Sequence, residues 1–153
     1  MAAEKSAWGL QMRVIAKLMF ALALSFWGIV GAQAAQLVAR VDVSKQIMTV
    51  SYGGEVLHSW AVSTGKSGHY TPRGAYRPQR MTTMWRSKKY NNAPMPYSVF
   101  FTGGYAVHGT SHVKALGRPA SHGCVRLKTS NAAVLYALIQ QVGRKNTRIV
   151  ISN

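Results

Sequence analysis

Short apolar runs separated by glycine-rich turns make up most of this 153-residue chain. Residues 36–43, 47–52 and 55–63 each have the length and composition of a strand, with apolar side chains alternating loosely with polar ones. Gly53-Gly54 is a two-residue hairpin signal, because glycine adopts the positive φ angles that such turns require. The pattern therefore predicts that the domain opens as an antiparallel meander.

Loops and further strands alternate in the middle of the chain. Composition predicts a loop at 64–68, a turn at 71–74 and a long surface loop at 85–96, which is rich in Lys, Asn and Pro and has no periodicity. Strands are predicted at residues 75–81, 97–102 and 105–108, with Gly103-Gly104 as a tight turn between the last two.

A single segment follows a helical period. Thr129 or Ser130 is a candidate N-cap, apolar residues recur at helical spacing from Ala133, and Gly143 is a stop signal. Residues 147–151 then close the chain as a strand. Seven or eight short strands and one main α-helix near the C-terminus predict a mostly β fold, a small β-sandwich or barrel.

The N-terminal region has the pattern of an export signal. Two basic residues precede an apolar run at 18–30, which is shorter than the roughly 20 residues of a membrane span. Small residues follow at 31–35 and predict a signal peptide at 1–34, cleaved after Ala34. An uncleaved anchor is the alternative. Cleavage would leave residues 35–153 as a single exported domain without a transmembrane segment.

The net charge of the chain indicates which kinds of partner the domain would bind. The chain has 19 Lys and Arg against three Asp and Glu, and its formal net charge is +16. Asp42 and Glu55 are the acids of residues 35–153, so that part carries +14. Anionic lipid, anionic glycan or an acidic cell-wall peptide suits this charge. A nucleic-acid partner is not expected, because DNA binding leaves the export signal and the lone thiol unexplained.

Cys124 is the only cysteine, and it lies in the run Ser121-His122-Gly123-Cys124-Val125-Arg126. In an oxidising compartment a single thiol has no internal disulfide partner. Its alternatives are a small buried apolar residue and a nucleophile, which must lose its proton to react. His108 and His122 are the candidate bases. The group that orients the base is expected to be a backbone carbonyl, because both acids are distant in sequence.

Gly123 and Arg126 add further chemistry to this run. Glycine beside a nucleophile allows consecutive amides to converge, so the N–H groups of His122, Gly123 and Cys124 are candidate oxyanion donors. On a strand, Arg126 would share the face of Cys124 and bind a substrate carboxylate, whereas the alternative is a solvated charge. A zinc site built from histidines and the thiol is disfavoured by spacing, so no metal or cofactor is predicted.

Together these elements resemble the signature of the L,D-transpeptidase catalytic domain, the YkuD family. His108-Gly109-Thr110 followed by the Ser121–Arg126 run carries the resemblance, which extends over residues 37–151. The gap between the two elements is short for the family, and Arg126 stands where the strict motif has Asn. The family implies a β-sandwich-like catalytic domain in the periplasm, without a cofactor.

The resemblance also implies a reaction on the tetrapeptide stems of peptidoglycan. The thiol would attack the carbonyl between meso-diaminopimelate and the terminal D-alanine, forming a thioester and releasing D-alanine. A second stem as acceptor would give a crosslink, a lysine of an outer-membrane lipoprotein would give a tether, and water would give an L,D-carboxypeptidase. A non-catalytic peptidoglycan-binding module on the same fold is the remaining alternative.

The family's residue roles transfer onto the matching positions of this chain. Cys124 would be the nucleophile and His108 the general base, with Gly109 orienting His108 through its backbone. Shaping of the oxyanion site would fall to Ser121, His122 and Gly123, and binding of a substrate carboxylate to Arg126. Acylation of Cys124 by carbapenems is a further implication of this thiol chemistry.

Overall fold

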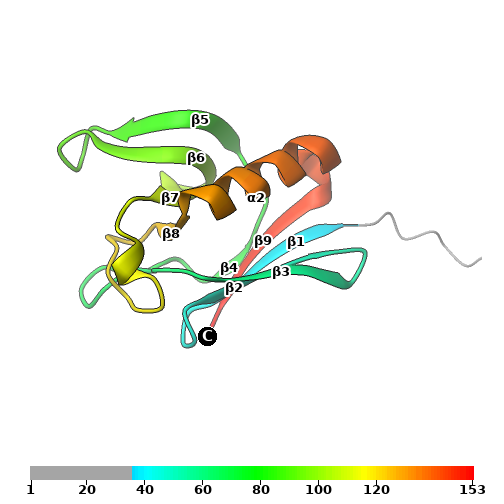
Figure 1. Cartoon of the computed structure of the whole chain (residues 1–153), viewed down its shortest axis with the longest axis horizontal. Helices are drawn as coiled ribbons and strands as arrows, with labels where there is room; N and C mark the ends of the chain where they lie inside the picture. The colour runs from blue at the N-terminus through cyan, green and yellow to red at the C-terminus, as the bar shows by residue number, and fades with distance from the viewer. Residues whose placement is uncertain (1–35) are drawn as a thin grey trace, which may run out of the picture. The chain divides into compact units, whose positions relative to one another are not determined.

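The computed structural model describes residues 36–153, which form two β-sheets and one main helix (Figure 1). Alternating apolar side chains account for the first strands. Strand β1 (Leu37–Asp42) buries every second residue, and the side chains of Leu37, Ala39 and Val41 are fully enclosed. β2 (Ile47–Tyr52) runs antiparallel to β1, and β3 (Glu55–Ala61) runs antiparallel to β2. The predicted opening meander is confirmed.

The first sheet is completed from distant parts of the sequence. β9 (Thr147–Ser152) runs parallel to β1, and the short β4 (Gly74–Tyr76) lies on its other side. The strand order is β3-β2-β1-β9-β4. Every second residue of β9 is buried, so this face of the sheet continues the apolar face of β1.

The second sheet has four strands in sequence order: β5 (Arg80–Ser87), β6 (Ala93–Thr102), β7 (Tyr105–Thr110) and β8 (Val125–Lys128). β7 and β8 are parallel, and the segment between them includes the 3₁₀ helix η1 (Val113–Ala115). β8 therefore starts directly after Cys124, beside the strand that carries His108.

The helix α2 (Thr129–Val142) packs on β6, β7 and β8 and also contacts β1. Its buried residues share one core with the inner faces of both sheets. Gly143, with φ 91°, ends it as predicted, and the 3₁₀ helix η2 (Arg144–Asn146) leads into β9. The N-cap is Lys128, one or two residues before the expected Thr129 or Ser130, because β8 continues into the helix without a loop.

The fold class is confirmed as mostly β, with two sheets and one main helix near the C-terminus, and residues 36–153 contain nine strands. Two local predictions were wrong. The stretch 85–96 is not one long loop but the tip of the β5–β6 hairpin: it contains the end of β5, a turn at residues 88–92 and the start of β6. Asn91 and Asn92 in this turn have φ angles of 48° and 54°. The strand expected at 75–81 is interrupted by residues 77–79, which lead from one sheet to the other.

The signal peptide predicted at 1–34, with its cleavage after Ala34, lies outside the described residues. No helix within residues 36–153 is both long enough and apolar enough to cross a membrane.

Candidate active site

A buried hydroxyl fixes the turn that carries Cys124. Ser121 is fully buried, and its Oγ donates to the Cys124 carbonyl at 2.6 Å while accepting from the Gly123 N–H at 2.9 Å. Gly123 has a φ of 115°, and a Cβ at this position would lie 2.5 Å from Cε1 of Tyr105. The turn therefore requires glycine for both its backbone conformation and its packing.

The cysteine turn is also held by hydrogen bonds to residues outside the Ser121–Arg126 run. The Ser121 N–H donates to the Thr64 carbonyl at 2.9 Å, and the Lys66 N–H donates to the Ser121 carbonyl at 3.0 Å. Thr64 is held by the buried Gln46, whose Nε2 donates to Thr64 Oγ1 at 2.6 Å and whose Oε1 accepts from the Thr64 N–H at 2.8 Å. Gln46 and Thr64 thus support the cysteine turn through a buried network.

The parallel pairing of β7 and β8 brings the predicted site residues together. His108 is the register partner of Arg126, so both side chains project from the same face of the sheet. Cys124 precedes Arg126 by two residues and is packed against an apolar cluster on that face, formed by Met95, Phe100, Ala106 and Trp85. His108 in β7 and Cys124, directly before β8, therefore lie on the same face of this sheet.

His108 is buried and has its tautomer set by the backbone. Its Nδ1 donates to the Gly109 carbonyl at 2.7 Å, which leaves Nε2 free to accept a proton. Gly109 itself passes close to the start of α2, because a Cβ there would lie 3.0 Å from Cα of Thr129. Burial lowers the pKa of His108 to about 4, the Gly109 carbonyl opposes that shift, and the charge of Arg126 adds to it.

Opposing influences act on the pKa of the Cys124 thiol. Burial raises the pKa of the Cys124 thiol, while hydrogen bonding to the Ala106 backbone and the charge of Arg126 act in the opposite direction. The pKa of His108 is lowered, so the two shifts favour the neutral forms of the thiol and of the imidazole. The arrangement is suited to proton transfer from sulfur to imidazole during attack, not to a thiolate that exists beforehand.

The three backbone N–H groups expected to bind an oxyanion, those of His122, Gly123 and Cys124, differ in whether they already have a hydrogen-bond partner. The Gly123 N–H is already bonded to Ser121 Oγ, so the prediction that it serves as a donor does not fit this turn. The N–H groups of His122 and Cys124 remain for a developing oxyanion. Gly123 and Ser121 shape the turn that presents these two amides.

Arg126 is half-buried beside the thiol and is tied into the site by both its backbone and its side chain. Its backbone exchanges two hydrogen bonds with Ser63, at 2.9 and 3.0 Å, and its Nη1 donates to the Ala120 carbonyl at 3.3 Å. The guanidinium lowers the pKa values of both His108 and Cys124. The guanidinium is therefore held in place by the backbone and is not a freely solvated charge.

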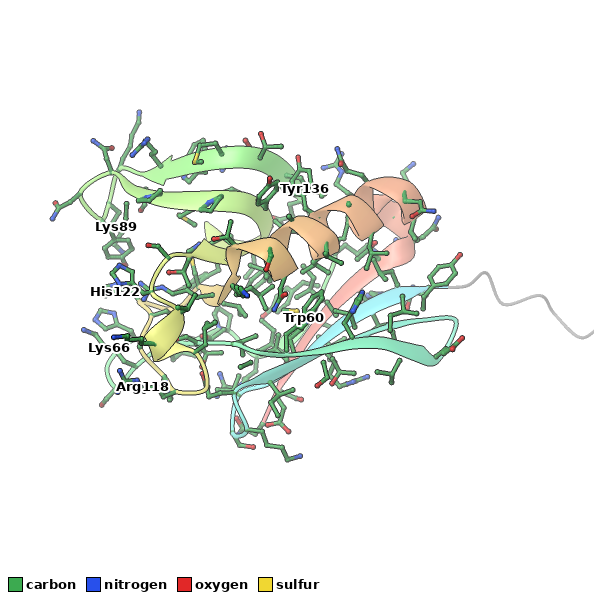
Figure 2. All side chains as sticks on the ribbon, viewed as in Figure 1. Trp60, Lys66, Lys89, Arg118, His122 and Tyr136 are labelled. Atoms are coloured by element: carbon green, nitrogen blue, oxygen red, sulfur yellow. The ribbon has the colours of Figure 1, made fainter. Side chains whose placement is uncertain are left out.

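His122 occupies the rim of the site. Its ring stacks on Tyr90 at a centroid distance of 4.5 Å and an angle of 17°, and meets His69 edge-on at 4.7 Å. Tyr90 adjoins the β5–β6 turn and His69 lies in the 64–70 loop, so three segments meet at this imidazole. Figure 2 shows His122 between Lys89 and Lys66 at one edge of the domain.

The remaining histidines of the described chain, His58 and His112, belong to other elements. His58 stacks on Trp60 in β3 at 4.7 Å, and His112 is the N-cap residue of η1. In the part of the chain described here, no three His, Cys, Asp or Glu side chains are grouped so that they would hold a metal ion.

The family model for the L,D-transpeptidase catalytic domain, YkuD, matches residues 36–151. Among curated proteins, the chain is similar to the L,D-transpeptidase homologue YkuD of Bacillus subtilis (strain 168), with 21% identity over 116 residues. That alignment covers 73% of this chain and 63% of the relative.

Solved structures agree with the sequence match. An L,D-transpeptidase from Mycobacterium smegmatis has 27% identity and a TM-score of 0.69, covering 78% of this chain and 59% of the other. An LD transpeptidase solved in complex with imipenem has 26% identity and a TM-score of 0.68, covering 77% and 59%. The chain thus spans less than two-thirds of the length of each of these relatives.

Proposed function

This chain belongs to the L,D-transpeptidase catalytic domain family, and from that premise we propose that it is a cysteine acyltransferase acting on peptidoglycan tetrapeptide stems. Cys124 is the nucleophile and His108 is the general base. The observation that carries the proposal is the placement of the chain's single thiol on the same sheet face as an imidazole whose Nε2 is free.

In the first half of the reaction the thioester forms. Cys124 Sγ attacks the carbonyl between meso-diaminopimelate and the terminal D-alanine, and its proton passes to His108 Nε2. The oxyanion of the tetrahedral intermediate accepts hydrogen bonds from the N–H groups of His122 and Cys124. Collapse breaks the C–N bond, and D-alanine leaves as an amine after taking the proton from His108.

In the second half an acceptor amine attacks the thioester. His108 removes a proton from that amine, the new C–N bond forms, and the C–S bond breaks to give back the protonated thiol. The Gly109 carbonyl keeps the imidazole in one tautomer throughout, and it stabilises the imidazolium that forms transiently in each half. Arg126 holds a substrate carboxylate beside the thiol.

Export to the periplasm or cell envelope belongs to the same proposal. The signal-like pattern of residues 1–34, with cleavage after Ala34, supports it, and so does the net charge of +16, which suits an anionic wall. The proposal leaves the acceptor as one of three: the amine of another stem, a lysine of an outer-membrane lipoprotein, or water.

Intact-mass measurement with imipenem tests the nucleophile directly. A relative in the same family has been solved in complex with imipenem, so a β-lactam carbonyl is a suitable electrophile. The wild-type protein should gain one adduct, and Cys124→Ala should gain none while remaining folded. An unmodified wild-type mass, or an equal adduct on Cys124→Ala, would contradict the role of Cys124.

A further inference from the structure

Cationic side chains converge on the rim of the site from separate segments. The His122 ring stacks on Tyr90 at 4.5 Å and meets His69 edge-on at 4.7 Å, and Lys89 Nζ lies 5.5 Å from the centroid of the same Tyr90 ring. Burial lowers the pKa of His122, and the charges of His69, Lys66, Arg126 and Lys89 lower it further. Groups from the 64–70 loop, the β5–β6 turn and β8 therefore surround one half-buried imidazole next to the cysteine turn. Figure 2 shows Lys89, His122, Lys66 and Arg118 along one edge of the domain.

Within the described residues, no acidic side chain is paired with the cationic groups of this rim. Asp42 and Glu55 are the carboxylates of residues 36–153. Asp42 is engaged with Lys45 at 3.0 Å and with Ser44 at 2.7 Å, and Glu55 begins β3. An approaching substrate therefore meets positive charge that no nearby side chain neutralises, and its own charge decides how well it binds.

We propose that Lys66 and Lys89 are specificity-determining residues that select acceptor peptides with free carboxylates over carboxamide or lysine-rich acceptors. The inference rests on the proposed function and deepens it, because it assigns a chemical class to the acceptor. Arg126 is the group proposed above to hold a carboxylate beside the thiol, whereas Lys66 and Lys89 are exposed and come from two different segments, with His122 between them (Figure 2).

The position of the two lysines explains why they act on selectivity. Both ammonium groups are solvated, so each contributes modestly and is screened by salt. An acceptor with two carboxylates gains from both lysines at once, its carboxamide form gains from neither, and a lysine-rich segment is repelled. Selectivity should therefore be largest at low ionic strength and should shrink as salt is added.

Binding to the Cys124→Ala protein tests the inference without requiring turnover. The probes are a stem tripeptide ending in meso-diaminopimelate with free carboxylates and the same tripeptide with its carboxylates converted to carboxamides. Calorimetry gives the ratio of the two dissociation constants. The ratio is then measured in proteins that also carry Lys66→Glu, Lys89→Glu or both. Lys145→Glu in η2 is the matched control, since it makes the same charge change on an exposed lysine away from the rim.

The free-carboxylate peptide should bind more tightly, with the preference falling about threefold for each lysine reversed and about tenfold for the pair. Lys145→Glu should keep the original preference. Equal binding of the two peptides, or a preference that survives in the double variant, would overturn the inference. The proposed function is judged separately by imipenem acylation of Cys124, so an acylating protein without charge preference would count against the inference alone.

Discussion

Replacing Ser121 with alanine removes a hydroxyl that is fully buried beneath the cysteine turn. Two backbone groups lose their partner in that change, the Cys124 carbonyl at 2.6 Å and the Gly123 N–H at 2.9 Å. Alanine fits the space but offers neither a donor nor an acceptor. The turn would then keep its two polar groups buried without partners, or distort to reach water.

The expected loss follows from these two bonds. An ordinary hydrogen bond contributes about 1 kcal/mol net, and a buried group left without a partner costs about 1–3 kcal/mol. With two groups affected, we expect Ser121→Ala to lower the free energy of unfolding by about 3 kcal/mol. Ser98 is an internal control, because it is also fully buried but donates a single bond, to the Met95 carbonyl at 2.8 Å. Ser98→Ala should cost about 1 kcal/mol.

Urea denaturation and imipenem acylation together separate local support of the site from general stability. At a slope of about 2 kcal/mol/M, Ser121→Ala should lower the midpoint by about 1.5 M and Ser98→Ala by about 0.5 M. Acylation should fall at least about tenfold in Ser121→Ala, because the attacking sulfur and the oxyanion donors are displaced, and should be unchanged in Ser98→Ala. Equal midpoints for the two variants, or wild-type acylation in Ser121→Ala, would refute this reasoning.

Three further predictions concern the same site. Because burial lowers the pKa of His108 to about 4, the unfolded chain binds the proton more readily, and stability should fall by up to about 3 kcal/mol as pH drops from about 6.5 to about 4. His108→Gln should flatten that dependence in urea titrations, and an unchanged slope would argue against a buried neutral imidazole. Arg126→Gln should raise the pKa of His108, because the guanidinium lowers it, and should therefore shift the acid limb of the pH–acylation profile to higher pH. An acid limb at the wild-type pH would show that the charge of Arg126 does not affect the pKa of His108. Gly123→Ala, with φ at 115° and a Cβ 2.5 Å from Tyr105, should cost about 2 kcal/mol or more and abolish acylation, so a wild-type urea midpoint would contradict the described turn.

The parts of the fold that were predictable from sequence are those fixed by local residues. Gly53-Gly54 and Gly103-Gly104 mark hairpins because both pairs have positive φ angles, and Gly143 ends α2 for a related reason. The apolar pattern of residues 36–43 and 47–52 was enough to predict strands there. Such signals require no knowledge of distant segments.

The β5–β6 hairpin was missed because its prolines suggested a loop. Pro94 and Pro96 pair with β5, but the ladder between β6 and β7 includes only residues from Val99 onward. Proline lacks the N–H of a ladder bond, and it is tolerated where a strand has one neighbour instead of two. The Asn91-Asn92 pair was the available signal, since asparagine accepts positive φ in tight turns.

The candidate site also has features that local sequence predicts and features that depend on contacts between distant segments. A lone thiol in a glycine-containing run and a histidine in a predicted strand singled out Cys124 and His108, which lie on one face of the second sheet, and their catalytic roles stay a prediction. The Gln46–Thr64 support and the bonding of the Gly123 N–H to Ser121 were not predictable, because they depend on how distant segments pack. Sequence therefore indicated the chemistry, and the structure adds which amides remain for it.

Mass spectrometry of the protein incubated with a disaccharide-tetrapeptide tests the central claim most directly. The account predicts release of D-alanine and a crosslinked dimer, both lost in Cys124→Ala. Tripeptide alone would keep Cys124 as nucleophile and make water the acceptor. Absence of any Cys124-dependent product from the folded protein would contradict the account and favour a peptidoglycan-binding module on this fold.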